Sequence, residues 1–330
     1  MQVKAVGFRG QLHSVFGRVV NVLGDGQLVS IADAPIGDLP NGVQVQLDAG
    51  YGFRDAGLRP DMVIVGDGAH LIVDGGTLTV DLSHAAVIPA RKVIEGRLLP
   101  WSERLANLRM AQERGMASAS GAGLGPFWSG LDAVMAADLP NLLAAFSASS
   151  LCGAAAGPLC ELVAGLRLGD IARAANAEER LVGLGIGLTP SCDDVLTGMM
   201  GAMAILGDAL GLAEYLAPLL DATASAAKGH THIIAWTYIQ RAVRGEVSSA
   251  LANYIIALST GSAPDIEVAT RNLFAVGGTS GMELALGAAI GVWLLVCEEC
   301  RDVPGNMPWH TGFRSDPGSL SCSEAKGWAL

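Results

Sequence analysis

The residues with the clearest capacity for chemistry lie in a glycine-rich segment near the middle of the chain. Residues 183–194 read Gly-Leu-Gly-Ile-Gly-Leu-Thr-Pro-Ser-Cys-Asp-Asp. Alternating glycines permit positive φ angles and close approach of the backbone to a ligand. Thr189 is a good helix N-cap, Pro190 suits the first helical position, and two carboxylates would fall in the first turn. The segment therefore predicts a helix start whose free N–H groups form an anion site.

The local sequence does not decide between a functional and a structural role for this segment. No Lys-Ser or Lys-Thr pair follows the glycines, so the segment is not a P-loop. Residues 177–184 have helical rather than strand character, so it is not a secure dinucleotide fingerprint either. A capped helix whose acids favour the helix dipole would have the same sequence.

A second segment with the same order of residue types follows later in the chain. Residues 277–283 read Gly-Gly-Thr-Ser-Gly-Met-Glu and precede another apolar stretch. One constant offset (280 − 191 = 89) pairs a serine, an acid and a glycine of the two segments: Ser191 with Ser280, Asp194 with Glu283, and Gly198 with Gly287. An acid and a glycine four residues apart lie on one face of a helix. We therefore expect a pseudo-twofold pair of helix N-termini at one pocket, with Ser191 and Ser280 on the order of 10 Å apart.

Such a pocket would offer hydroxyl and N–H groups to an anion and carboxylates to a proton or a metal ion. The side chains expected to act in catalysis are Ser191, Asp193 and Asp194. The residues expected to bind the substrate or an anion are Gly185, Gly187, Thr189, Thr231, Gly278, Thr279, Ser280, Gly281 and Glu283. Thr231 is included because it opens a further helix between the two loops. No metal ion is firmly indicated, although Asp193, Asp194 and Glu283 could bind Mg²⁺.

Composition and charge exclude several classes of function. Of 330 residues, 51% are hydrophobic and 16% charged, and the net charge is −11. Such a chain repels nucleic acids and anionic membranes, and its longest uninterrupted apolar stretches are shorter than the ~20 residues of a membrane span. Charged residues interrupt every candidate signal-peptide core, so we expect a cytoplasmic protein. Cys297 and Cys300 have metal or redox spacing without a second pair, which favours ordinary buried thiols.

The apolar period changes along the chain and predicts an α+β organisation. Residues 1–115 are β-rich, with short runs at 15–23, 28–32, 43–47, 62–65, 69–73 and 77–82. They predict a small barrel or sandwich closed by a helix over 101–114. Residues 116–126 are expected to form a linker, 127–302 an all-helical domain rich in Ala and Gly, and 303–330 a loosely ordered tail.

With these residues in place, the chain resembles the AllH family, bacterial proteins associated with the oxamate carbamoyltransferase of allantoin breakdown and otherwise known as a domain of unknown function. Residues 185–198 are similar to the Gly-x-Gly-Leu-Thr-Pro-Ser-Gly-Asp-Asp segment of that family, and residues 278–287 to its Ser-Gly-x-Asp segment. The stretches 14–21 and 231–258 also look alike. The sequence departs from the pattern at Cys192, where the family has glycine, and at Glu283, where it has aspartate.

The resemblance implies a role in carbamoyl transfer between a phosphate and a small amide-bearing carboxylate such as oxamate, together with partner subunits. The first hypothesis is therefore a carbamoyltransferase component that binds a small anionic substrate. The alternatives are a non-catalytic subunit that binds a partner or regulatory ligand, and a Mg²⁺-dependent phosphate-transfer enzyme. Whether this chain or a partner subunit is catalytic stays open at the level of sequence.

Overall fold

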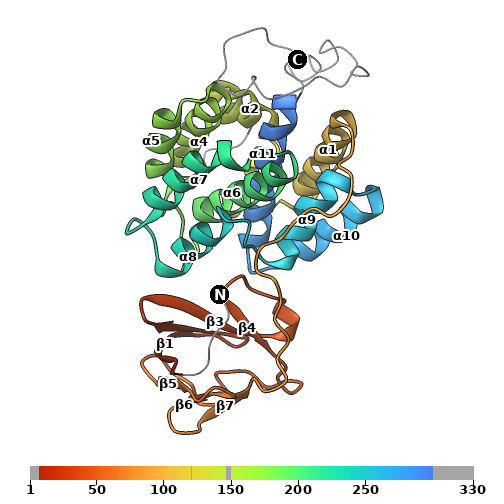
Figure 1. The fold of residues 1–330 in the computed structure, drawn as a ribbon. Helices are drawn as coiled ribbons and strands as arrows, with labels where there is room; N and C mark the ends of the chain where they lie inside the picture. The colour runs from red at the N-terminus through yellow and green to blue at the C-terminus, as the bar shows by residue number, and fades with distance from the viewer. Residues whose placement is uncertain (1–6, 120, 146–149, 300–330) are drawn as a thin grey trace. The chain divides into compact units, whose positions relative to one another are not determined.

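A computed structural model describes residues 7–119, 121–145 and 150–299 (Figure 1). It confirms the α+β class, with a β-rich N-terminal region followed by a helical region. The chain forms two compact units. The first comprises the residues up to Lys92 together with Glu246–Ser249, and the second comprises Val93–Gly245 together with the residues from Ala250 onward.

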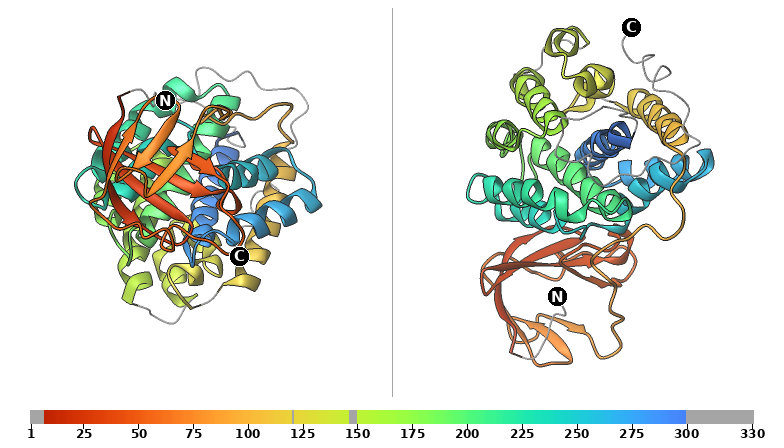
Figure 2. Two further views of the ribbon diagram at one scale, coloured as in Figure 1. Left: turned by 90° about the horizontal axis from the view of Figure 1, so that it is seen from below. Right: turned by 45° about the horizontal axis from the view of Figure 1, so that its top comes forward.

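The first unit is one seven-stranded sheet that curves into a nearly closed, barrel-like form (Figure 2). Its strands are β1 (Arg9–Val15), β2 (Val19–Gly24), β3 (Gln27–Asp33), β4 (Gly42–Val45), β5 (Val63–Gly66), β6 (His70–Val73) and β7 (Leu78–Asp81). Their spatial order is β4-β3-β2-β1-β5-β6-β7. All neighbours are antiparallel except β3 and β4, which are parallel. Alternate residues such as Leu12, Val22 and Ile64 are buried in a core inside this sheet.

The strand predictions are largely confirmed, with one correction. The predicted runs 69–73 and 77–82 form the hairpin of β6 and β7, and Asp74, Gly75 and Gly76 between them all have positive φ angles as a tight turn requires. The single run predicted over 15–23 is instead divided by a turn, in which the Phe16 N–H donates to the Val19 carbonyl. Its first residue ends β1, a strand that the apolar pattern did not indicate.

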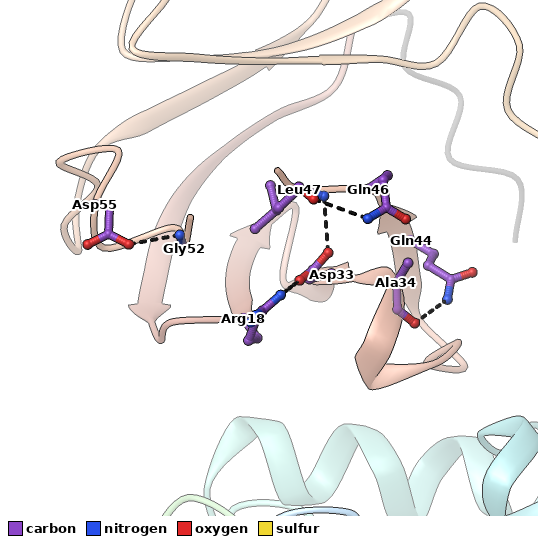
Figure 3. A network of polar contacts seen from close by, with 8 residues as sticks. All are labelled: Arg18, Asp33, Ala34, Gln44, Gln46, Leu47, Gly52 and Asp55. Carbon is purple, nitrogen blue, oxygen red and sulfur yellow. Dashed lines mark hydrogen bonds and ion pairs between the residues drawn. The ribbon is translucent and has the colours of Figure 1, made fainter. Parts of the chain in front are cut away.

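A buried carboxylate holds the turns at one end of this sheet together (Figure 3). Asp33, at the end of β3, accepts hydrogen bonds from the Arg18 guanidinium and from the Leu47 N–H, the latter at 3.1 Å. Burial acts to raise the pKa of Asp33, but these donors more than offset it and the pKa lies below its usual value. Asp33 is therefore an ion-paired structural acid.

The second unit is helical. Its α-helices in the described residues are α1 (Trp101–Ser118), α2 (Leu131–Ala136), α3 (Leu139–Ala144), α4 (Ser150–Leu168), α5 (Ile171–Leu181), α6 (Ser191–Ala209), α7 (Ala213–Ala227), α8 (Ile233–Ala242), α9 (Ser249–Thr260), α10 (Ala263–Phe274) and α11 (Ser280–Glu299). Two 3₁₀ turns, η1 (Ala34–Ile36) in the first unit and η2 (Gly125–Trp128) in the second, complete the elements. Helix α11 lies near the middle of the helical unit and packs on α6, α1 and α10 (Figure 2).

Two features of the helical unit differ from expectation. Helix α10 follows α9 directly and begins at a capping box formed by Ser262 and Asp265, a signal that the sequence analysis did not use. Helix α1 was expected to close the β-rich domain, but it packs on α10 and α11 and belongs to the helical unit. The boundary between the units accordingly follows Lys92 rather than residue 115, and residues 116–126 are no linker between them.

One helix of the described chain, over Leu151–Leu168, is long and apolar enough to cross a membrane by length and composition. Half of that stretch is buried inside the protein, where α4 packs on α5, α2 and α3, and core helices pass the same test. The Cys297–Cys300 pair and the tail at 303–330 lie outside the residues whose side chains the structure describes.

Candidate functional site

Helix α6 begins one residue later than predicted. Pro190 is the N-cap, with an extended ψ of 145°, and Ser191 is the first helical residue. The Thr189 side chain is therefore not the cap. The N–H groups of the first turn are already used within the chain: that of Cys192 donates to the Leu184 carbonyl, and those of residues 193 and 194 donate to the Pro190 carbonyl.

Helix α11 begins with two backbone hydrogen bonds that correspond to those of α6. The Gly281 N–H donates to the Val276 carbonyl, and the N–H groups of Met282 and Glu283 both donate to the Thr279 carbonyl. At the offset of 89 residues, Gly281 is the counterpart of Cys192 and Thr279 that of Pro190. The bonds of residues 193 and 194 to Pro190 are thus repeated at the start of α11, whereas the N–H groups of Cys192 and Gly281 have acceptors that are not counterparts.

The two helices cross in close contact through the predicted glycines. A Cβ on Gly198 would overlap the Leu284 carbonyl oxygen, and a Cβ on Gly287 would overlap the Val195 carbonyl oxygen. These contacts are reciprocal, because Val195 and Leu284 are themselves counterparts at the same offset. The crossing therefore has pseudo-twofold symmetry and brings the two helix starts together.

The hydroxyl groups of the two loops meet where the helices begin. Thr189 Oγ1 lies 3.3 Å from Ser280 Oγ, and both residues are partly exposed. Ser191 Oγ lies 3.4 Å from the position that a Cβ on Gly123 would take, and Glu283 Oε1 overlaps that same position. The structure confirms that the two loops share one location, while a pocket between them stays a prediction.

Asp193 is bound by the chain on both carboxylate oxygens. Oδ1 accepts the Gly183 N–H at 2.8 Å, and Oδ2 accepts the Thr231 hydroxyl. Burial raises the pKa of Asp193, although these two donors oppose the shift. The contacts hold the glycine loop and the start of α8 against α6. Asp193 and Thr231 therefore hold the loop in place, and their contact with a ligand stays a prediction.

Glu283 is likewise satisfied within the chain. Its Oε1 accepts the Leu124 N–H at 3.0 Å, its Oε2 accepts the Thr279 hydroxyl at 3.1 Å, and the residue is 1% exposed. Leu124 and Gly123 (φ 56°) come from the segment that the sequence analysis took for a linker. This segment is a third glycine-rich loop of the site. Its Gly-Ala-Gly-Leu-Gly composition at 121–125 was the available signal.

Asp194 differs from both of these acids. It is 4% exposed, and its Oδ2 is buried without a hydrogen-bond partner. Burial raises its pKa well above the usual value, the hydroxyls of Ser280 and Thr189 lower it in part, and the neighbouring Glu283 and Asp193 raise it further. A buried polar atom without a partner is costly, and a catalytic or binding role is one physical reason for a native protein to retain it.

The glycines expected to approach a ligand divide into two groups. A Cβ on Gly185 (φ 130°) would overlap the Ser191 nitrogen, and one on Gly281 would overlap the Leu273 carbonyl, so these two serve packing. A Cβ on Gly187 or Gly278 would meet nothing within 4 Å, and both residues are exposed. The space beside the backbone is open at these two positions.

Cys192, which replaces the glycine of the family pattern, is buried at 2% exposure beside these acids. Burial raises the pKa of its thiol, so it is a packed neutral side chain and not a nucleophile. Within the described residues, no group of three or more His, Cys, Asp or Glu side chains could hold a metal ion. The three-acid Mg²⁺ site of the sequence analysis is therefore not formed, because the carboxylates of Asp193 and Glu283 accept hydrogen bonds from other residues of the chain.

The fold and the site together define an α+β protein with a barrel-like N-terminal unit and a pseudo-symmetric pair of helix starts in its helical unit. Residues 181–292, which contain both starts, match the family model described as oxamate carbamoyltransferase subunit AllH. Residues 2–87 match the model of the AllH family N-terminal domain, and the two models together cover more than half of the chain. The protein belongs to the AllH family. No curated protein and no solved structure matches it.

Proposed function

We propose that this chain is a subunit of a carbamoyltransferase and binds a small anionic substrate, such as oxamate or carbamoyl phosphate, at the paired starts of α6 and α11. The family description names an oxamate carbamoyltransferase subunit, and partner subunits follow from that role. The observation that carries the proposal is the contact of Thr189 with Ser280 beside the buried, incompletely paired Asp194.

The anion would be bound by loop N–H groups and hydroxyls. The first-turn N–H groups of both helices are largely used by the chain, so the donors left are those around Gly187, Gly278 and the hydroxyls of Thr189 and Ser280. Neutral donors fixed in a protein stabilise developing negative charge at little cost of reorganisation. In the transfer, the bond from the carbamoyl carbon to a phosphate oxygen breaks and a bond to the acceptor nitrogen forms. Phosphate leaves, and the acceptor nitrogen loses a proton.

Ser191, Asp193 and Asp194 have different roles in this proposal. Asp193 fixes the loop through Gly183 and Thr231. Ser191 lies beside the Gly123 loop, where its hydroxyl can orient a ligand group. Asp194 is the acid that the chain leaves available, because its counterpart Glu283 is occupied by Leu124 and Thr279.

A ligand-binding regulatory subunit is the second candidate function. It is favoured by the occupation of two of the three acids at the site, which leaves few groups for acid–base chemistry. The two candidates differ in what loss of the site does to the assembled enzyme. Loss of a catalytic site lowers the rate at saturating substrate, whereas loss of a regulatory site leaves that rate intact and changes its response to ligand.

The test combines binding with reconstitution. Carbamoyl phosphate, oxamate and phosphate are each titrated into the purified chain, alone and with partner subunits, and carbamoyl transfer is assayed with and without the chain. We expect a bound ligand to raise the melting temperature, since it stabilises the fold that binds it. Thr189→Val should weaken binding by about tenfold, the effect of one lost hydrogen bond.

Thr260→Val is the matched control, because Thr260 in α9 donates its hydroxyl to the Ile256 carbonyl of its own helix. It should leave ligand binding unchanged. The proposal fails if none of the three ligands binds the chain alone or in the assembly, and carbamoyl transfer proceeds at the same rate without the chain.

A further inference from the structure

The two helix starts are alike in backbone but not in how their acids are satisfied. Glu283 on α11 receives an N–H group from Leu124, which the Gly123 loop places beside it. Asp194 is its counterpart on α6, and no described residue supplies the equivalent N–H group to its Oδ2. One half of the pseudo-symmetric pair is thus completed by the chain and the other half is not.

The unpaired oxygen lies at the candidate site and not elsewhere in the core. Asp194 interacts with the hydroxyls of Ser280 and Thr189, and these two hydroxyls lie 3.3 Å from each other. Both belong to loops that contain exposed glycines, Gly187 and Gly278. The two loops that the proposed function assigns to the substrate therefore also supply the hydroxyls next to Asp194.

We propose that Asp194 is the residue that recognises the amide group of the substrate, with Oδ2 accepting an N–H of a carbamoyl or primary amide group in the way that Glu283 accepts the Leu124 N–H. The inference rests on the proposed function and adds to it a specificity: the site selects ligands that carry –CO–NH₂ over ligands of the same shape without N–H. The ligand reaches the carboxylate by displacing the contact between Thr189 and Ser280.

The charges around Asp194 give this recognition a pH dependence. Glu283 of α11 and Asp193 of α6 are the charged groups that act on it, and the polar neighbours from the loops are Ser280 and Thr189. Burial raises the pKa of Asp194, and both neighbouring acids add to the shift. An N–H donor binds the ionised carboxylate best, so the preference for amide ligands should increase as pH rises through that pKa.

Pairs of ligands that differ only in NH₂ against CH₃ test the proposal. Oxamate is compared with pyruvate, and carbamoyl phosphate with acetyl phosphate, by titration calorimetry on the full chain and on the reconstituted assembly. We expect each amide ligand to bind about tenfold or more tightly than its methyl partner, as for a hydrogen bond to a charged group. In Asp194→Asn the preference should fall to about threefold or less, because the charge is lost.

Asp221→Asn is the matched control, an exposed aspartate on α7 whose substitution should leave the preference unchanged. The preference is also measured in the unchanged chain from acidic to neutral pH, which needs no variant to fold. A preference that is the same in Asp194→Asn, or does not increase with pH, overturns the assignment.

The outcomes also separate this inference from the proposed function. Equal binding of amide and methyl ligands refutes recognition by Asp194 and leaves the anion-binding subunit intact. Failure of all four ligands to bind in either form of the protein refutes both.

Discussion

The starts of α6 and α11 share a backbone pattern and a close helix crossing, yet they differ in what completes them. At α11 the acid is satisfied by the chain, through Leu124 and Thr279. At α6 the first acid, Asp193, is satisfied in the same manner, and the second, Asp194, retains a buried oxygen without a partner. The same motif is therefore completed by the chain at one helix start and left incomplete at the other, and the proposed function assigns the incomplete one to the ligand.

The largest expected effect comes from filling the helix crossing that both halves share. Gly198→Ala and Gly287→Ala each place a Cβ against a backbone carbonyl oxygen, which cannot turn aside as a side chain can. We expect each to lower the free energy of unfolding by about 3 kcal/mol or more, measured by urea denaturation. Gly153→Ala, at an exposed position of α4 with open space, should stabilise by about 0.5–1 kcal/mol. Unequal losses in the free energy of unfolding for Gly198→Ala and Gly287→Ala would contradict the equivalence of the two glycine contacts.

A second buried acid without full pairing sharpens the comparison, because it belongs to helix α5 and not to the loops. Glu178 of α5 accepts only the Thr223 hydroxyl, at 2.6 Å, and burial raises its pKa to about 7. The folded protein thus holds a proton that the unfolded chain releases near pH 4.5. Stability should fall as pH rises from about 4.5 to about 7 and level off above, by on the order of 3 kcal/mol.

Glu178→Gln removes this ionisation, so its free energy of unfolding should lack the corresponding decrease when measured by denaturation across that pH range. Parallel curves for the variant and the parent protein would show that Glu178 has the same pKa folded and unfolded. We expect ligand binding at the loops to be unchanged, since Glu178 and its donor Thr223 are buried in the core beside Met200, which Thr223 also contacts.

The next effect compares Glu283 with its counterpart Asp194 directly. Glu283→Gln weakens two hydrogen bonds to a charged, buried group and should cost about 1–3 kcal/mol in the free energy of unfolding at pH 7. Asp194→Asn removes a buried charge that lacks a donor and should leave stability unchanged or increase it, while ligand affinity falls. The sign follows from the raised pKa of Asp194, because ionisation above pH 3.8 then costs stability. Equal destabilisation by both variants would contradict a division into structural and functional halves.

The smallest effect concerns the loops themselves. Gly187 has a φ of 92° in open space, so Gly187→Ala should cost about 1 kcal/mol from backbone conformation alone. Gly278 is open without a positive φ, and Gly278→Ala should be close to neutral. Chemical denaturation of the two variants in parallel measures the difference. A larger loss at Gly278 than at Gly187 would show that its loop takes part in packing after all.

The sequence was most informative where local chemistry and helix geometry are sufficient. The glycine-rich loop, Pro190 and the two acids that follow predicted the start of α6 to within one residue. The offset between Ser191 and Ser280 predicted the crossing at Gly198 and Gly287, because residues four apart on a helix share a face and only glycine permits such contact. Period-two runs predicted most strands of the barrel-like sheet. The turn before β2 was not predicted, because its position depends on how β1 pairs with β2.

Which acid is left for a ligand was decided only by the tertiary structure. The sequence alone does not distinguish Asp193, Asp194 and Glu283, which are all acids in the first turns of two similar segments. They differ in hydrogen-bond pairing, which depends on donors far away in the chain. Thr231 and Leu124 are such donors, the second from a stretch whose glycine content alone suggested a linker. Burial and hydrogen-bond pairing depend on which segments pack together, and that is a property of the whole helical unit. The sequence by itself determined the helix starts and their meeting, and the packing around them determined that Asp194 keeps an unpaired oxygen.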